Sequence, residues 1–175
     1  MSAADLIAQH WMAVAAWGLV ASAVMATLLE GAQLLGLSRM SLPFLFGTFV
    51  TPNRRRALVT GWLAYLAGGW LFALLYALLL DSFGVAGIAA TAALGLLAGL
   101  AHGAFLVAVF LPLLPYVHPR LATDYDGPQS LGMIEPPGPF GLNYGTATPV
   151  VTLGAQALYG LILGTGLGAA TGMAG

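Results

Sequence analysis

The sequence predicts an all-α integral membrane protein, a bundle of four transmembrane helices, and three observations lead to this prediction. Of its 175 residues, 59% are hydrophobic and only 6% are charged, whereas a typical soluble domain has about 25% charged residues. Four apolar segments are each long enough to cross a bilayer with a hydrocarbon core about 30 Å thick. Backbone polar groups in lipid must pair within the protein, which favours helices over open strands. A water-soluble fold is excluded, because so few charges cannot cover a core.

The four predicted spans follow one another along the chain with a short turn or a longer loop between them. They run from about residue 11 to 36, from 57 to 80, from 83 to 114 and from 149 to 173. The first segment lacks the basic start of a secretory signal, so we expect it to be retained. Together the spans predict a single transmembrane domain over residues 1–175.

Two segments outside the spans are expected to be ordered as well. Residues 40–50 are apolar but too short to cross, and Pro43 interrupts them, so they should lie in the interface or re-enter the membrane partway. Residues 116–148 are rich in Pro and Gly, and the run from Pro136 to Gly141 cannot continue a helix. This second segment is predicted to be an ordered, irregular loop.

The arginines predict the orientation of the chain. All five cations are arginines. Arg39 and residues 54–56 lie between the first and second spans, and Arg120 lies between the third and fourth. Because cations near span ends are retained in the cytoplasm, we expect both arginine-bearing loops inside and both termini outside.

Glycines are expected to hold the helices together. Lipid tails are as apolar as leucine, so membrane helices associate through small residues that let backbones approach closely. Glycines recur every four residues in the third and fourth spans, at Gly95, Gly99, Gly103, Gly160, Gly164 and Gly168. These two rows either pack the four helices against each other or present one face to a partner chain.

Glu30 is the most informative polar residue, because a carboxylate within a span costs about 2.5 kcal/mol or more to insert. His102 lies on the glycine-bearing face of the third span, in the same half of the membrane. We expect Glu30 and His102 to form a buried polar pair, with Gln33, one turn beyond Glu30, as a third member. The pair could fix helix register, handle protons or bind a metal.

A metal site would need further ligands, and a chain without cysteine can supply only His and carboxylate groups. The candidate ligands beside the Glu30 and His102 pair are His118 and the loop acids Asp124, Asp126 and Glu135. No Glu-x-x-His or His-x-x-x-His pair occurs on a predicted helix. The sequence is therefore compatible with a divalent metal but requires no cofactor.

No catalytic constellation emerges from the sequence. It contains no Gly-x-Ser-x-Gly elbow, no phosphate-cradling Gly-rich Lys motif and no cysteine nucleophile. Nucleic acid is excluded as a partner, because the charges nearly cancel and the basic cluster is confined to residues 54–56.

Four stretches also carry a resemblance to a known family. They are LPFLFGTFVTPNRRR at 42–56, GLAHG at 99–103, LLPYVHPR at 113–120 and EPPGPFGLNYG at 135–145. They look like an uncharacterised family of small four-helix bacterial inner-membrane proteins. The resemblance implies a location in a bacterial inner membrane, and it implies no particular chemistry. It draws attention to Glu135, Asn143 and Tyr144, which join Asp124 as polar candidates in the inner loop.

The function expected from these observations is non-enzymatic. Partners would be the lipid bilayer and other membrane protein chains, met through helix packing in a homo-oligomer or as an accessory subunit of a larger complex. The alternative is a metal- or proton-binding transport or redox protein centred on Glu30 and His102. A third interpretation is binding of lipid or a hydrophobic small molecule in a groove beside Pro43.

Overall fold

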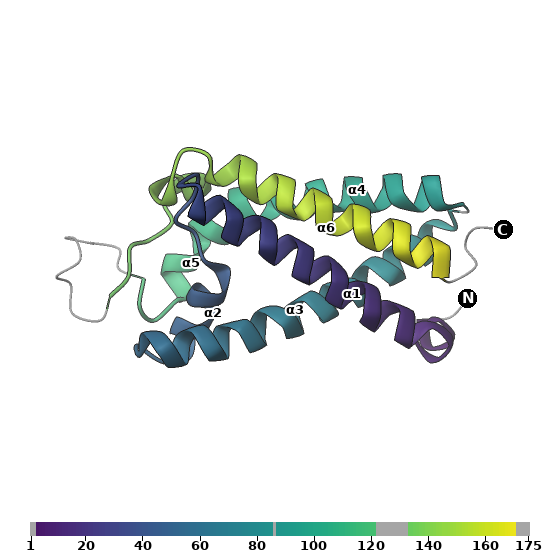
Figure 1. Ribbon diagram of the computed structural model, residues 1–175, viewed down its shortest axis with the longest axis horizontal. Coiled ribbons are helices and arrows are strands. Elements are labelled where there is room, and N and C mark those ends of the chain that lie inside the picture. Colours follow the sequence, from purple (N-terminus) through teal and green to yellow (C-terminus); the bar gives the residue numbers. More distant parts are fainter. Residues whose placement is uncertain (1–2, 86, 122–132, 171–175) are drawn as a thin grey trace. The chain divides into compact units, whose positions relative to one another are not determined.

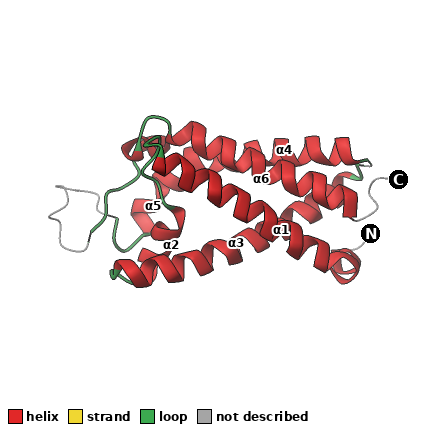
Figure 2. Ribbon diagram, viewed as in Figure 1, coloured by secondary structure: helices red, strands yellow, loops and turns green. Residues whose placement is uncertain are grey.

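The computed structural model describes residues 3–85, 87–121 and 133–170 of the chain (Figure 1). In these ranges every regular element is a helix (Figure 2). Leu121 and Ile134 form an isolated β-bridge. The predicted all-α class is therefore confirmed for the described part of the chain.

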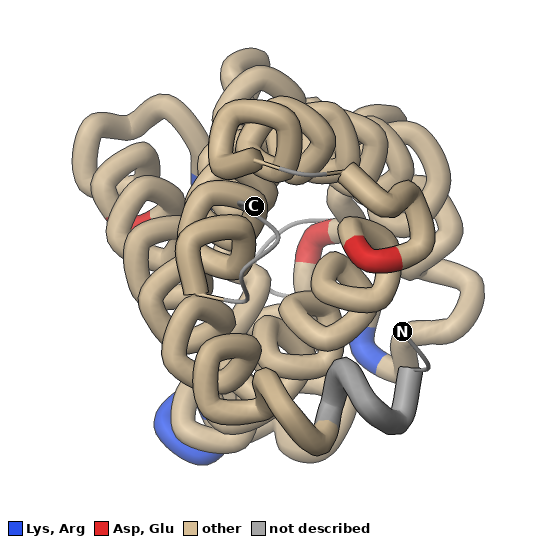
Figure 3. The backbone as a smooth tube through the Cα atoms, turned by 90° about the vertical axis from the view of Figure 1, so that its right-hand side faces the viewer, with Lys and Arg blue, Asp and Glu red and all other residues tan. Residues whose placement is uncertain are grey.

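Four helical segments are long and apolar enough to cross a membrane, as the sequence predicts. They span Ala8–Leu34, Arg54–Phe83, Ile88–Val117 and Thr148–Ala170. The first belongs to α1 (Ala3–Leu34), the second is α3 (Arg54–Phe83) and the last is α6 (Thr148–Ala170). Figure 3 shows that most of the backbone carries neither acidic nor basic residues. The chain is thus a multi-pass membrane protein.

The third span is not a uniform α-helix. It consists of α4 (Ile88–Phe105), the π-helical turn η1 (Leu106–Phe110) and α5 (Leu111–Val117). The N–H of Leu111 bonds to the carbonyl of Leu106, one residue further back than in an α-helix. Pro112 and Pro115 follow directly, and neither can donate a backbone hydrogen bond. The wide turn therefore lies where prolines already interrupt regular α-helical bonding.

The turn between the second and third spans comes later than predicted. The predicted second span ends at residue 80 and the predicted third span begins at residue 83, but α3 continues to Phe83 and α4 begins at Ile88. Gly84 and Gly87 have φ values of +59° and +88°, which side chains rarely adopt. These two glycines, rather than the polar Asp81 and Ser82, fix where the chain reverses.

The contacts group the chain into two compact units. Unit 1 combines residues 1–27, 66–102 and 154–175, and unit 2 combines residues 28–65 and 103–153. Each unit has its own packing. The single domain expected from the sequence stays a prediction.

In unit 1, helices approach each other at glycines. A Cβ atom added at Gly95 would lie 2.3 Å from the carbonyl oxygen of Gly160, and one at Gly99 would lie 2.3 Å from that of Gln156. These distances are far below van der Waals contact, so the α4 and α6 backbones touch directly. On α3, a Cβ atom at Gly69 would meet the Ser22 hydroxyl of α1 at 2.1 Å.

In unit 2, the short helix α2 (Leu42–Val50) lies directly on the beginning of α3 and beside α5 (Figure 1). The Ser41 hydroxyl accepts a hydrogen bond from the Phe44 N–H and caps the helix. A Cβ atom at Gly47 would lie 1.7 Å from the Ala57 carbonyl oxygen, and one at Gly61 would lie 1.7 Å from that of Pro43. The expected segment at 40–50 is therefore a helix packed against a span.

Candidate functional site

Two connections between spans meet in unit 2. The first, residues 35–53, joins the first two candidate spans, and the other, residues 118–147, joins the last two. In a chain that crosses a membrane four times, these connections lie on the same side. The Arg39 N–H of the first connection donates to the Tyr144 carbonyl of the second at 2.6 Å, and the Ser38 hydroxyl lies 2.8 Å from that of Thr148, the first residue of α6.

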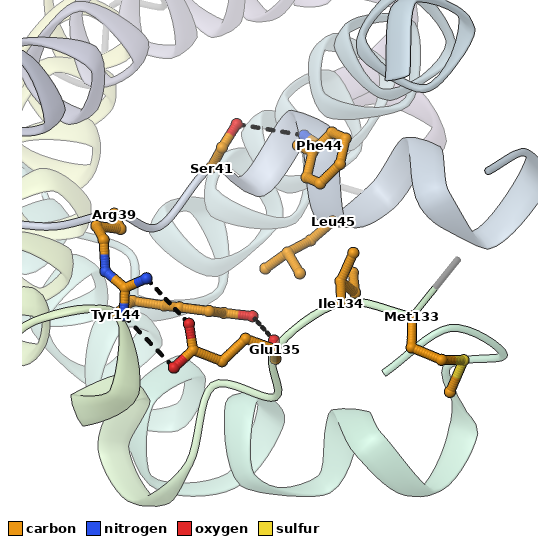
Figure 4. Close-up of a pocket in the computed structure, with 8 residues that line it drawn as sticks. All are labelled: Arg39, Ser41, Phe44, Leu45, Met133, Ile134, Glu135 and Tyr144. Atoms are coloured by element: carbon orange, nitrogen blue, oxygen red, sulfur yellow. Dashed lines mark hydrogen bonds and ion pairs between the residues drawn. The ribbon is translucent and has the colours of Figure 1, made fainter. Parts of the chain in front are cut away.

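A pocket of about 220 Å³ lies between the two connections (Figure 4). It is lined by Arg39, Ser41, Phe44, Leu45, Met133, Ile134, Glu135 and Tyr144. In Figure 4 the Arg39 and Glu135 side chains form one part of the wall, and Phe44, Leu45 and Ile134 form another. The pocket is therefore amphipathic, with an ion pair and apolar side chains in the same small space.

The ion pair has a two-point geometry. Arg39 Nη1 lies 3.0 Å from Glu135 Oε2, and Nη2 lies 3.4 Å from Oε1. Nη2 also donates to the Asn143 carbonyl. The Arg39 side chain is 66% exposed and that of Glu135 is 29% exposed. Pairs this accessible contribute about 0–1 kcal/mol to stability, so a ligand can open the pair at little cost.

Tyr144 anchors the floor of the pocket. Its side chain is buried, and its hydroxyl donates to the Glu135 carbonyl at 2.7 Å. Burial raises the pKa of Tyr144 and the Glu135 carboxylate raises it further, while Arg39 acts in the opposite direction. Asn143 holds the same loop through Nδ2, which donates to the Pro136 carbonyl at 3.0 Å. The phenol therefore stays neutral and serves as a structural hydrogen-bond donor.

His118, the first residue of the second connection, binds that connection to α2. It is buried, and its Nε2 atom lies 3.0 Å from the Leu45 carbonyl oxygen and 3.2 Å from the Thr48 hydroxyl. The Arg120 N–H donates to Nδ1 at 3.1 Å. An acceptor at Nδ1 and a donor at Nε2 define the neutral ring with its proton on Nε2. Burial lowers the pKa of His118, the Leu45 carbonyl opposes this shift, and the Arg120 charge adds to it.

Arg120 secures the carboxyl end of α2. Its Nη1 atom donates to the Thr48 carbonyl and, at 3.2 Å, to the Phe49 carbonyl. The last carbonyls of a helix have no partner within the helix, and a cation there also complements the helix dipole. The Phe49 ring packs edge-on against His118, with ring centroids 4.0 Å apart. Together these contacts tie α2 to the second connection.

The structure does not bring Glu30 and His102 into one described site. Glu30 and Gln33 lie near the end of α1 in unit 2, whereas His102 belongs to unit 1. Their pairing therefore stays a prediction. Glu30 interacts electrostatically with Tyr65, and the Gln33 side-chain nitrogen is buried without a hydrogen-bond partner.

His102 has aromatic neighbours within unit 1. Its ring centroid lies 4.2 Å from that of Phe72, and the Tyr76 hydroxyl lies 3.5 Å from Nδ1. Both aromatics belong to α3. Their helical spacing on α3 puts them on one face, but nothing in the sequence matches that face to His102.

The residues proposed as metal ligands do not gather in the described part of the chain. No group of three His, Asp or Glu residues there is arranged to hold a metal ion. Asp124 and Asp126 lie outside the described residues. Both ring nitrogens of His118 are engaged in hydrogen bonds within the protein, and its proposed role as a ligand stays a prediction.

The glycines singled out for packing have different surroundings. Gly95 and Gly99 of α4 meet the face of α6 that carries Gly160 and Gly164. A Cβ atom at Gly168 would lie 2.1 Å from the Thr91 hydroxyl. Gly103 is buried in unit 2. Gly95 and Gly99 thus face Gly160 and Gly164 within unit 1, an arrangement of the intramolecular kind.

Arg39, Ser41, Thr48 and Arg120 were not predicted as members of a site. The arginines served in the sequence only to orient the chain. Arg120 bonds to a residue 72 positions away, and Arg39 to one 96 positions away. Charged residues are rare in this sequence, so the arginines stand out. Their bonding partners, however, can be identified only in the folded chain.

No family model, curated protein or solved structure matches the chain. The family resemblance therefore stays an expectation.

Proposed function

We propose that the protein is a non-enzymatic integral membrane protein that binds an amphiphilic molecule of the bilayer in the pocket between α2 and the 133–144 segment. The observation that supports this is the lining of the pocket. The Arg39 and Glu135 ion pair offers polar contacts, while Phe44 and Leu45 offer apolar ones. Such a combination suits a molecule with a polar end and a hydrocarbon part.

The size of the pocket narrows this proposal. Sites for drug-sized ligands usually occupy about 300–1,000 Å³, and this pocket has about 220 Å³. It would therefore take the polar end of a lipid and not the whole molecule. A lipid also needs no soluble access route, because the hydrocarbon part can remain in the bilayer.

The test is the lipid that stays bound after purification in mild detergent, identified by native mass spectrometry. Met133→Trp fills the pocket from its exposed rim and should remove most of the retained lipid. Leu142→Trp, on the same connection but outside the pocket lining, is the matched control and should retain it. If the wild-type protein retains no lipid, the proposal is wrong.

Assembly with other chains is a second candidate, supported by a different observation. The glycine rows of α4 and α6 are occupied by each other, so they cannot supply a partner surface. Gly31, Gly68 and Gly154, however, lie within helices and have no atom within 4 Å of an added Cβ. Small residues on an open helix face allow another helix to approach closely. Assembly could produce a homo-oligomer or an accessory subunit of a larger complex.

Gly154→Leu tests this second candidate. Gly154 is exposed and a Cβ atom there would have no neighbour within 4 Å, so we expect the fold to persist in the leucine variant while a close helix contact with a partner is blocked. We expect the mass measured by light scattering in detergent to fall to that of the monomer. An assembly that is unchanged by Gly154→Leu, Gly31→Leu and Gly68→Leu would exclude these faces.

The cellular setting belongs to the same proposal. We place the chain in a bacterial inner membrane, with the arginine-bearing connections in the cytoplasm and both termini outside. The support is the position of the five cations: Arg39 and Arg120 lie in the two connections, and residues 54–56 form the first turn of α3, directly after the first connection. For the alternative function, a metal- or proton-binding protein centred on Glu30 and His102, the support is still the sequence alone.

A further inference from the structure

We infer that the pocket between α2 and the 133–144 segment selects a zwitterionic aminophospholipid, with the lipid phosphate on Arg39 and the primary ammonium on Glu135. This inference rests on the proposed binding of an amphiphile and names its headgroup. It follows from the charge, hydrogen-bonding capacity and position of the pocket.

The charge balance of the pocket favours a ligand that carries both signs. The lining contains one cation, Arg39, and one anion, Glu135, which neutralise each other in the free protein. An anionic headgroup that opened the pair would leave Glu135 without a partner, and a cationic one would leave Arg39 without a partner. A zwitterion replaces both halves of the ion pair at once, so no charge is left unpaired.

The hydrogen-bonding capacity favours a primary ammonium. The Arg39 guanidinium has five N–H donors, and its described contacts are the two Glu135 oxygens and the Asn143 carbonyl. Donors remain for phosphate oxygens. Each Glu135 oxygen faces one arginine nitrogen and can accept further hydrogen bonds. An ammonium group has three N–H donors to offer, whereas a quaternary choline headgroup has none.

The position of the pocket suits a headgroup. Arg39 follows the end of the first candidate span, which closes at Leu34, and Glu135 precedes the fourth, which opens at Thr148. Arg39 therefore lies shortly after the end of a candidate span, and its ion pair with Glu135 keeps the carboxylate beside it. Phe44 and Leu45, on the apolar helix α2, form the neighbouring wall. Charged contacts at the end of the spans beside an apolar wall match the boundary between headgroup and acyl chains.

The inference is tested with the full-length protein in nanodiscs that contain equal amounts of phosphatidylethanolamine, phosphatidylcholine and phosphatidylglycerol. The lipids that remain bound on release from the nanodisc are counted by native mass spectrometry. We expect phosphatidylethanolamine to exceed each of the others about tenfold, the ratio produced by one charge-assisted hydrogen bond.

Two variants locate the selectivity. Glu135→Gln should abolish the preference for phosphatidylethanolamine over phosphatidylcholine, because the amide cannot balance the ammonium charge. Arg39→Gln should reduce retention of all three phospholipids, because each carries a phosphate. Arg54→Gln, an exposed arginine outside the pocket lining, is the control and should behave as the wild type. Unfolding midpoints of all variants establish that changes in retention do not reflect misfolding.

The outcomes separate this inference from the proposed function. Equal retention of the three lipids, or a preference for phosphatidylglycerol, would overturn the zwitterion assignment while leaving amphiphile binding in place. No retained lipid in the wild type would overturn both. Selectivity that survives in Glu135→Gln would place the recognition of the ammonium elsewhere and overturn the assignment to this pocket.

Discussion

Gly154 and Gly164 show how differently one residue type can be used on a single helix. A Cβ atom at Gly164 would lie 2.2 Å from the Thr91 carbonyl oxygen of α4. At Gly154 the added atom would meet nothing within 4 Å. Position 164 therefore requires glycine, because the Thr91 backbone beside it cannot move aside as a flexible side chain can.

Replacing each glycine with alanine should therefore have opposite effects on stability. Gly164→Ala should destabilise the protein by about 1–3 kcal/mol, the usual cost of overpacking. Gly154→Ala should be neutral or stabilise it by up to about 1 kcal/mol through helix propensity. Reversible unfolding in mixed micelles of increasing SDS content measures both. Equal effects would show that α4 and α6 do not touch at Gly164.

Single residues of the site were predictable only in part. Glu135, Asn143 and Tyr144 were singled out through the resemblance of their loop to a family. The partner of Glu135, Arg39, lies 96 positions away, and no local pattern joins them. His118 was predicted as a candidate metal ligand, and its burial against α2 depends on contacts that only the folded chain creates.

At the scale of elements, α2 depends on groups outside itself. As a nine-residue helix, it is too short to be stable alone. It is capped by Ser41 at one end and held by His118 and Arg120 at the other. The protonation state of His118 should therefore control how firmly α2 is anchored.

Acid should loosen α2. Protonated His118 would carry a hydrogen on Nδ1, which now accepts the Arg120 N–H, so this bond would be lost. Because the pKa of His118 is lowered in the folded protein, its contribution is complete above the unfolded-state pKa of about 6.5 and is lost as the pH falls through the folded value. Hydrogen exchange of residues 42–50, corrected for intrinsic rates, should quicken on acidification.

His118→Gln is the matched control for the pH effect. Glutamine can still donate a hydrogen bond to the Leu45 carbonyl but does not titrate. Exchange in α2 of this variant should be independent of pH after the same correction. A wild-type protein with pH-independent exchange would show that His118 does not govern the anchoring.

Elements with a strong apolar signal were predictable, and their irregularities were not. The spans begin and end within a few residues of the predicted positions, apart from the start of the third. There, the positive φ values of Gly84 and Gly87 fix the turn, whereas polarity pointed to Asp81 and Ser82. The π-helical turn at Leu106–Phe110 was not foreseen, because hydropathy is the same for either helix type.

At the scale of the whole molecule, the absence of cysteine allows the orientation to be tested cleanly. Pro52→Cys places a thiol in an exposed position of the first connection, and Ser82→Cys places one at the end of α3. A membrane-impermeant maleimide added to intact cells should label Ser82→Cys and not Pro52→Cys. The reverse pattern would invert the proposed orientation, and labelling of both would contradict a crossing between them.

Composition alone predicts the environment of the molecule but not its activity. Few charges and four long apolar helices identify a multi-pass membrane protein. Its candidate site has no motif, because it is formed by residues 39–45 and 133–144, two segments that meet only after folding. Lipid binding in a groove beside Pro43 was one interpretation of the sequence, but the polar contacts that support the amphiphile proposal exist only in the folded chain.

The anchoring of α2 also has a consequence for how the chain is made. Arg120 binds the Thr48 carbonyl, 72 positions earlier in the chain. At a ribosomal rate of about 5–20 residues per second, this partner is added roughly 4–14 s after Thr48. Until then α2 can settle on the nascent α3, but its last carbonyls have no arginine to bind. The carboxyl end of α2 can therefore be anchored by Arg120 only after the third membrane-spanning segment has been translated.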